Sequence, residues 1–204
     1  PVYGDVVDWS YTAAAFGEGD YIEGFGYLLL AMLPLATVGQ IKILGRLAKI
    51  LTRRGISKVK AELITVLVEA IEKKYRKIVE KLKRDHPHLD LSIPENASYI
   101  GTLADKKTEN WLKRTARKLP GVTVDFELDL GMRSGQMPQE NSPDVDIGIY
   151  YKGELIAIIE LKLSTVPDSS DNKRFAMHKF ANAYPKIPVF FITGKGEISM
   201  LRTN

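Results

Sequence analysis

The stretch PDVDIGIYYKGELIAIIELK, residues 143–162, decides the fold of this chain. Val or Ile occupies every second position of residues 144–150, and apolar residues recur at the same spacing from Leu155 onward. This period of two is typical of β-strands, because successive side chains of a strand point to opposite faces. The sequence therefore predicts two antiparallel strands, joined by a tight turn at Gly153, whose apolar sides face one core.

The register of this hairpin determines which polar residues lie together on its other face. If both uncharged faces meet one core, Val145 pairs with Ile159 and the strands are joined by a three-residue turn. Asp144 then lies opposite Glu160, with Cβ atoms about 5 Å apart. Carboxylates that close repel each other unless a cation lies between them, and Mg²⁺ suits an oxygen-only site. Lys162 follows on the same side, where it can orient a water or stabilise charge on a phosphoryl group.

The motif formed by Pro143-Asp144 and Glu160-Leu161-Lys162 resembles that of the PD-(D/E)xK nuclease superfamily. The resemblance implies that Asp144 and Glu160 bind a metal, Mg²⁺ or else Mn²⁺ or Zn²⁺, together with the main-chain carbonyl of Leu161. It also implies that Lys162 is the catalytic lysine. A solvated hairpin with a charged outer face is the structural alternative, although Ile residues share the face of Glu160 and argue against full exposure.

The same resemblance suggests further site residues. Asp146 is an alternative to Asp144, because members of the family differ in this spacing. Many members also use an acid on the first helix of the core, and Glu109 is the candidate here. Residues after the motif often contact nucleic acid in this family, and the candidates are Lys173, Arg174 and His178. A solvent-facing basic helix explains these three residues equally well.

The elements around the hairpin complete a mixed α/β layer. A helix is predicted from Leu103 to Leu119, and a strand follows at residues 122–130, where Asp125, Glu127 and Asp129 alternate in a pattern typical of a solvated face. A second helix and two strands are predicted at residues 172–183, 189–193 and 198–201. This order is similar to the restriction-endonuclease-like core of the family, which we place in a domain of residues 96–204.

Residues 1–95 are predicted to form a separate all-α module. Residues 41–84 contain fourteen Lys and Arg against four acidic residues, whereas residues 1–40 contain five acidic residues and neither Lys nor Arg. A long helix is expected from Ser57 to about Arg84, followed by a linker. The chain has no cysteine, which excludes disulfides, thiol nucleophiles and cysteine-ligated zinc sites.

The beginning of the chain resembles the helical pre-toxin region of bacterial polymorphic toxins, including contact-dependent inhibition systems. The similarity comprises Pro1-Val2-Tyr3-Gly4-Asp5, then Gly19-Asp20-Tyr21, and the apolar segment around Pro34. It implies a toxin that is secreted or delivered from the cell surface, acts in the cytoplasm of a target bacterium, and is neutralised by a cognate immunity protein. A helical scaffold of no such function explains residues 1–54 equally well.

Four functions follow from these patterns. The first is a metal-dependent nuclease toxin that cleaves DNA or tRNA. The second is a restriction or repair nuclease without a toxin role. The third is a membrane-active toxin in which residues 25–38 contact or enter a bilayer, although Pro34 interrupts this segment. The fourth is a nucleic-acid-binding module without catalysis.

Overall fold

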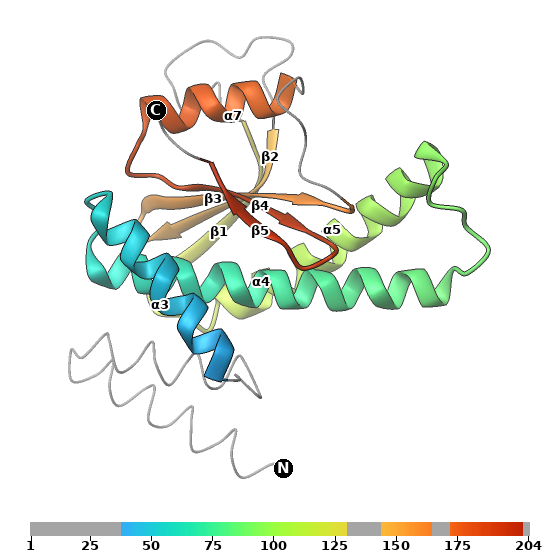
Figure 1. Cartoon of the computed structure of the whole chain (residues 1–204), viewed down its shortest axis with the longest axis horizontal. Coiled ribbons are helices and arrows are strands. Elements are labelled where there is room, and N and C mark those ends of the chain that lie inside the picture. The colour runs from blue at the N-terminus through green and yellow to red at the C-terminus, as the bar shows by residue number, and fades with distance from the viewer. Residues whose placement is uncertain (1–37, 130–143, 165–171, 202–204) are drawn as a thin grey trace. The chain divides into compact units, whose positions relative to one another are not determined.

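The computed structural model describes residues 38–129, 144–164 and 172–201 of the chain (Figure 1). The chain divides into two compact units, residues 1–70 and 71–204, which we describe separately. The division falls inside the long helix α4, Lys58–Asp85. It does not test the predicted boundary between residues 95 and 96, which stays a prediction.

The described part of the first unit consists of α3, Val38–Arg53, and the first half of α4. Gly55 ends α3 with a left-handed backbone, φ 80°. The amide of Ile56 donates to the carbonyl of Leu51, and the amide of Gly55 donates to that of Thr52, which together form a Schellman motif. Within the described residues, no helix is both long and apolar enough to cross a bilayer. The predicted membrane segment and the pre-toxin motifs lie almost wholly outside these residues.

The second unit is built around a five-stranded sheet in the order β1-β2-β3-β4-β5. Its strands are β1 Val122–Asp129, β2 Asp144–Tyr151, β3 Glu154–Lys162, β4 Val189–Thr193 and β5 Ile198–Met200. Neighbouring strands are antiparallel except β3 and β4, which are parallel and are separated in the sequence by α7, Asn172–Ala183. The prediction of a mixed sheet with flanking helices is therefore confirmed.

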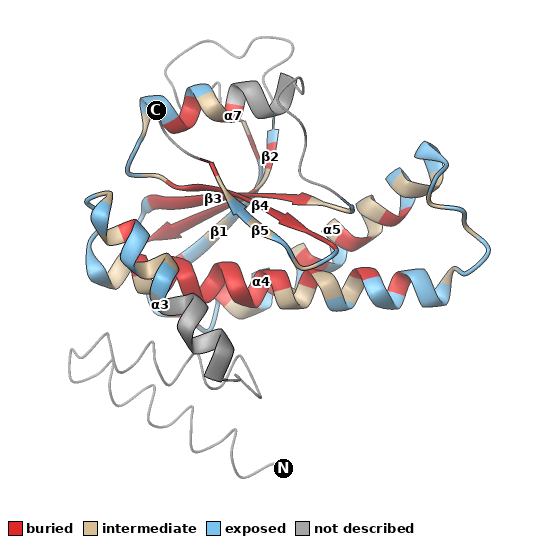
Figure 2. Cartoon of the chain, in the orientation of Figure 1, coloured by how far each residue is buried: buried red, intermediate tan, exposed pale blue. Residues whose placement is uncertain are grey.

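Helices cover both faces of this sheet. Helix α7 lies on one face, and α5, Pro94–Ala116, lies on the other together with the part of α4 that begins at Ile71 (Figure 1). On the α7 face, Met177 and Phe180 pack in a cluster with Ile158, Val189 and Phe191. The three central strands β2, β3 and β4 are buried over most of their length, whereas the edge strands β1 and β5 are more exposed (Figure 2). We call the cluster that Met177 and Phe180 form with these strand residues the α7 core.

Helix α5 begins nine residues before the predicted start at Leu103. Pro94 occupies the first helical turn, where its fixed φ is compatible with the helix and its missing amide hydrogen costs nothing. Asp90 orders the preceding turn, because its carboxylate accepts from the amide of Ser92 and its carbonyl accepts from the side chain of Asn96. The predicted start was wrong because Pro94, which the sequence pattern assigns to a linker of residues 85–97, instead begins the helix.

The register of the β2–β3 hairpin differs from the prediction by two residues. Ile147, and not Val145, pairs with Ile159. The turn contains two residues, Lys152 and Gly153, with φ of 52° and 81°, as a type I′ turn requires.

A β-bulge explains why the predicted faces are nevertheless retained. The register shifts between Ile149 and Tyr150, so that Ile156 is an extra residue on β3. The bulge brings Ala157 opposite Ile149, whereas an uninterrupted ladder from a two-residue turn would bring Ile156 there. The apolar faces still meet, but each polar residue has a different partner.

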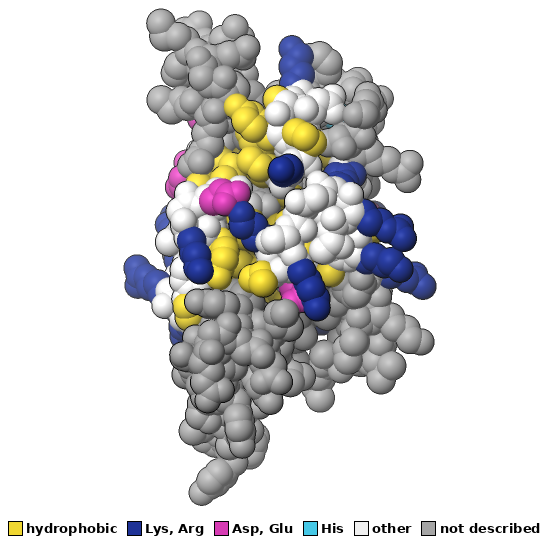
Figure 3. Space-filling model, turned by 90° about the vertical axis from the view of Figure 1, so that its left-hand side faces the viewer, with side chains coloured by type: hydrophobic (Ala, Val, Ile, Leu, Met, Phe, Trp, Pro, Cys, Tyr) yellow, Lys and Arg dark blue, Asp and Glu magenta, His cyan; other side chains and the backbone are white. Residues whose placement is uncertain are grey.

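Basic side chains are dispersed over the face of the molecule that Figure 3 shows. On the face drawn in Figure 3, Lys and Arg side chains are separated by hydrophobic and uncharged areas. Neutralising phosphates requires clustered positive charge. The described residues of this face therefore do not form one continuous basic patch.

Candidate active site

The observed register brings Asp146, and not Asp144, opposite Glu160. The last observed pair of the ladder is Ile147 with Ile159, and extending this register by one residue places Asp146 opposite Glu160. Asp144 is exposed and pairs with Asp129 of the edge strand β1. The prediction that Asp144 lies opposite Glu160 was therefore wrong. The alternative first acid, Asp146, occupies that position.

Asp146 is held in place by the neighbouring strand. Its Oδ2 accepts a hydrogen bond from the main-chain amide of Leu161 at 2.6 Å. Such a bond to a carboxylate is short and strong because the acceptor is charged. Leu161 thus contributes its amide to the orientation of Asp146, whereas the family resemblance implied a role for its carbonyl.

Glu160 and Lys162 form an ion pair at the end of β3. The side chain of Glu160 is only 1% exposed, and its Oε1 lies 2.8 Å from Nζ of Lys162, whose side chain is 27% exposed. A carboxylate this deeply buried requires a charged partner, because burial of an isolated charge is very unfavourable. The second oxygen, Oε2, is also buried and accepts no hydrogen bond.

A third carboxylate comes from helix α5. Tyr75 of α4 is fully buried and donates a hydrogen bond to Asp105. Burial raises the pKa of Tyr75 far above its usual range, and the negative charges of Asp105, Asp146 and Glu160 raise it further. Tyr75 therefore remains a proton donor at every physiological pH, and its hydroxyl group bonds to Asp105.

Asp105 was missed in the sequence, where Glu109 was the candidate on this helix. Glu109 forms an ion pair with Lys113, one turn further along α5. Both acids line the same pocket, since residues four apart share a face of a helix. Ala104 and Thr108 are buried and mark the inner side of α5. Their spacing along the helix was the sequence signal that could have identified Asp105 as an inward-facing acid.

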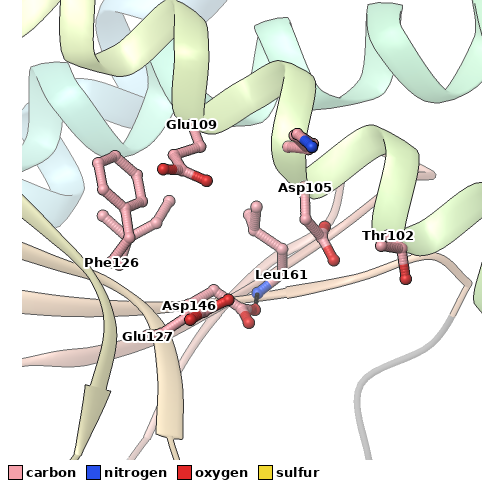
Figure 4. A pocket seen from close by; sticks show the side chains of 9 residues that line it. Thr102, Asp105, Glu109, Phe126, Glu127, Asp146 and Leu161 are labelled. Atoms are coloured by element: carbon pink, nitrogen blue, oxygen red, sulfur yellow. Dashed lines mark hydrogen bonds between the residues drawn. The ribbon is translucent and has the colours of Figure 1, made fainter.

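A pocket of about 380 Å³ lies between α5 and the strands β1, β2 and β3. Figure 4 shows Asp105 and Asp146 pointing into it from α5 and β2, beside the amide of Leu161. Glu160 and Lys162 lie on the strand beside the pocket and do not line it. The lining residues are Thr102, Asp105, Lys106, Glu109, Phe126, Glu127, Asp146, Ile147 and Leu161.

The donor atoms at this site fit a hard divalent cation. In the described part of the chain, no group of three or more His, Asp or Glu residues lies close enough to hold a metal ion. Mg²⁺ does not require such a group, since it commonly binds one or two carboxylates, several waters and substrate phosphates. Asp146 and Glu160 are two carboxylates on adjacent strands, and all available ligands are oxygen atoms, which suit Mg²⁺ or Mn²⁺ better than Zn²⁺.

Of the predicted nucleic-acid contacts, the described one lies away from this pocket. His178 is half-buried on α7, on the opposite face of the sheet from α5 (Figure 1). The side chains of Lys173 and Arg174 lie outside the described residues. The basic residues at the pocket are instead on α5. Lys106 lines it, and Nζ of Lys113 lies 5.0 Å from the centroid of the Phe126 ring.

Comparisons of the chain with models of known protein families, with curated proteins and with solved structures found no match.

Proposed function

We propose that the chain is a metal-dependent nuclease that hydrolyses phosphodiester bonds of DNA or tRNA. The observation that supports this most strongly is the hydrogen bond from the amide of Leu161 to Asp146, next to the ion pair between Glu160 and Lys162. Two carboxylates on adjacent strands can hold Mg²⁺ or Mn²⁺, and a Lys beside them can act on a water or a phosphoryl oxygen.

Each residue of the proposed site has a distinct task. Asp146, oriented by the amide of Leu161, and Glu160 would hold the cation. The cation would supply Lewis-acid activation of the phosphate and a lower pKa for a bound water. Lys162, kept at the site by Glu160, orients the attacking water and stabilises negative charge on the phosphate.

The architecture of the second unit is compatible with a restriction-endonuclease-like core. From α5 onward, the order is a helix, three antiparallel strands, a helix and two further strands, with β3 and β4 parallel. The acidic residues lie on β2 and β3 at the centre of this sheet. A fold supports many functions, so the proposal depends on the residues of the site.

The decisive experiment incubates the purified chain with plasmid DNA, single-stranded DNA and total tRNA, in Mg²⁺, in Mn²⁺ or in EDTA. We expect cleavage of one substrate class that requires the cation and that is lost in Glu160→Gln and in Lys162→Gln. Glu154→Gln and Lys152→Gln are matched controls, because they make the same changes at the other end of the hairpin. Cleavage in EDTA, or equal losses in the controls, would contradict the assignment.

We extend this proposal to a toxin delivered into a target bacterium and neutralised by an immunity protein. Its support is the resemblance of residues 1–54 to pre-toxin regions, which is independent of the site. Induced expression of the chain should arrest bacterial growth, and Glu160→Gln should relieve the arrest. Co-expression of a protein encoded next to the chain should also relieve it. Unchanged growth on expression of an active nuclease would favour a restriction or repair role.

A further inference from the structure

The edge strand β1 changes its orientation at Glu127. This residue has φ 53°, a left-handed conformation that is uncommon for a residue with a side chain. Phe126 and Leu128 would share one face of a regular strand. Phe126 instead lines the pocket beneath α5, whereas Leu128 packs in the α7 core.

The reversal brings Phe126 to the pocket together with Glu127. Backbone conformations that are unfavourable for the residue concerned are concentrated at functional sites, where the surrounding structure maintains them. Leu128 approaches within 3.1 Å of the position that a Cβ atom on Gly148 would occupy, so the absence of a side chain at Gly148 makes room for the reversal. The strand thus departs from a regular β conformation at Glu127, and this departure places the ring of Phe126 at the pocket.

The ring of Phe126 has the surroundings of a base-binding platform. It is half-buried, and Nζ of Lys113 lies 5.0 Å from its centroid. In Figure 4 the ring lies beside the carboxylate of Glu109, with Asp105 and Asp146 further along the pocket. The ring can stack on a base, Lys113 can contact a flanking phosphate, and the carboxylates of Glu109 and Glu127 can accept hydrogen bonds from exocyclic amino groups.

We propose that Phe126 and Glu127 form a subsite for one unpaired nucleobase, so that the substrate of the proposed nuclease is single-stranded nucleic acid. The inference deepens the proposed function, since it assigns a substrate class to the same pocket. A volume of about 380 Å³ is in the range of pockets that enclose small ligands. A base in a duplex is stacked and paired, and it reaches a pocket only after unstacking, whereas a base in a single strand or a loop needs no such step.

Binding without cleavage tests this proposal separately from catalysis. The full chain carrying Glu160→Gln is titrated in EDTA with a fluorescent single-stranded oligonucleotide, and with a duplex of the same sequence. We expect at least tenfold tighter binding of the single strand. Phe126→Leu should reduce this affinity about tenfold, whereas Phe126→Trp should preserve it, because stacking requires an aromatic face.

Tyr99→Leu is the matched control, because Tyr99 is an aromatic residue of α5 that is 51% exposed and does not line the pocket. Equal affinity for single strand and duplex would overturn the proposal, as would equal losses in Phe126→Leu and Tyr99→Leu. Thermal melting of each variant verifies that it is folded. If the single strand binds through Phe126 but the wild-type chain cleaves nothing, the subsite stands and the proposed nuclease function fails. If the wild-type chain cleaves nucleic acid but the single strand and the duplex bind equally well, the proposed nuclease function stands and the subsite fails.

Discussion

The two faces of the same sheet are built from different kinds of residue. The α7 face is closed by apolar side chains such as Phe180 and Phe191. The face toward α5 retains a pocket whose lining includes Asp105 and Asp146. Apolar burial is the dominant favourable contribution to folding, and buried carboxylates require specific partners. The comparison indicates that the α7 face contributes stability, whereas the α5 face retains polar residues on which the proposed function depends.

Removing a large side chain from the α7 core should have the largest effect. Phe180 is 5% exposed, and Phe180→Ala should lower the free energy of unfolding by about 3–5 kcal/mol. Urea denaturation measures this loss, with Lys179→Ala, at an exposed neighbouring position of α7, as the control. Metal-dependent cleavage per folded molecule should change little. Equal losses in the two variants would show that α7 does not stabilise the sheet.

On the other face, Asp146→Asn should reduce cleavage about a hundredfold or more with little loss of stability. The amide oxygen of Asn still accepts from the amide of Leu161, but the negative charge that would hold the proposed cation is absent. Asp144→Asn is the informative comparison, since the two residues are alternative candidates. We expect its effect on the cleavage rate to be at least tenfold smaller. The reverse order would support the predicted register and contradict the observed one.

The elements of the second unit were largely predictable, but the acid that the register places opposite Glu160 was not. Alternation of apolar residues shows which face of a strand is buried. It cannot distinguish a three-residue turn from a two-residue turn followed by a bulge at Ile156, because both place the same faces on the core. The ambiguity shifts the ladder by two residues, which is the spacing between Asp144 and Asp146.

Two other features of the pocket depend on contacts that the sequence pattern does not reveal. Asp105 and Glu109 lie four residues apart on one helix face, and only the contact with Tyr75, about thirty residues earlier, singles out Asp105. Glu127 continues a regular polar alternation with Asp125 and Asp129. Its left-handed backbone follows from the packing of Leu128 on the opposite face, and this tertiary contact overrides the local pattern.

Tyr75→Phe should destabilise the chain by about 1.5–3 kcal/mol at neutral pH, because the hydrogen bond to Asp105 has a charged acceptor. An unfolded tyrosine ionises near pH 10, whereas the pKa of buried Tyr75 is raised. Above pH 10 the unfolded state therefore loses a proton that the folded state keeps, and the stability due to Tyr75 decreases as pH rises.

Urea denaturation of the wild type and Tyr75→Phe at pH 8 and pH 11 measures this difference. The stability gap should shrink by about 1.4 kcal/mol at pH 11, which corresponds to one pH unit of linkage. A gap that is independent of pH would show that Tyr75 does not titrate differently in the folded state.

The smallest effect, and the sharpest test of the comparison, concerns backbone conformation. Among the described residues, Glu127 and Lys152 are the non-glycine residues with positive φ, at the pocket and at the hairpin turn respectively. Replacing either with Gly relieves a conformational cost of about 1 kcal/mol. We therefore expect Glu127→Gly and Lys152→Gly to raise the free energy of unfolding by similar amounts, measured by urea denaturation.

Their effects on function should differ. Lys152→Gly should leave single-strand affinity unchanged, because Lys152 lies in the hairpin turn and does not line the pocket. Glu127→Gly removes a carboxylate from the pocket and allows β1 to move, so the affinity should fall severalfold while stability rises. Such opposite changes in one variant would show that the unusual backbone at Glu127 is maintained for binding. If neither variant changes the affinity for single strands, the left-handed backbone at Glu127 has no role in binding.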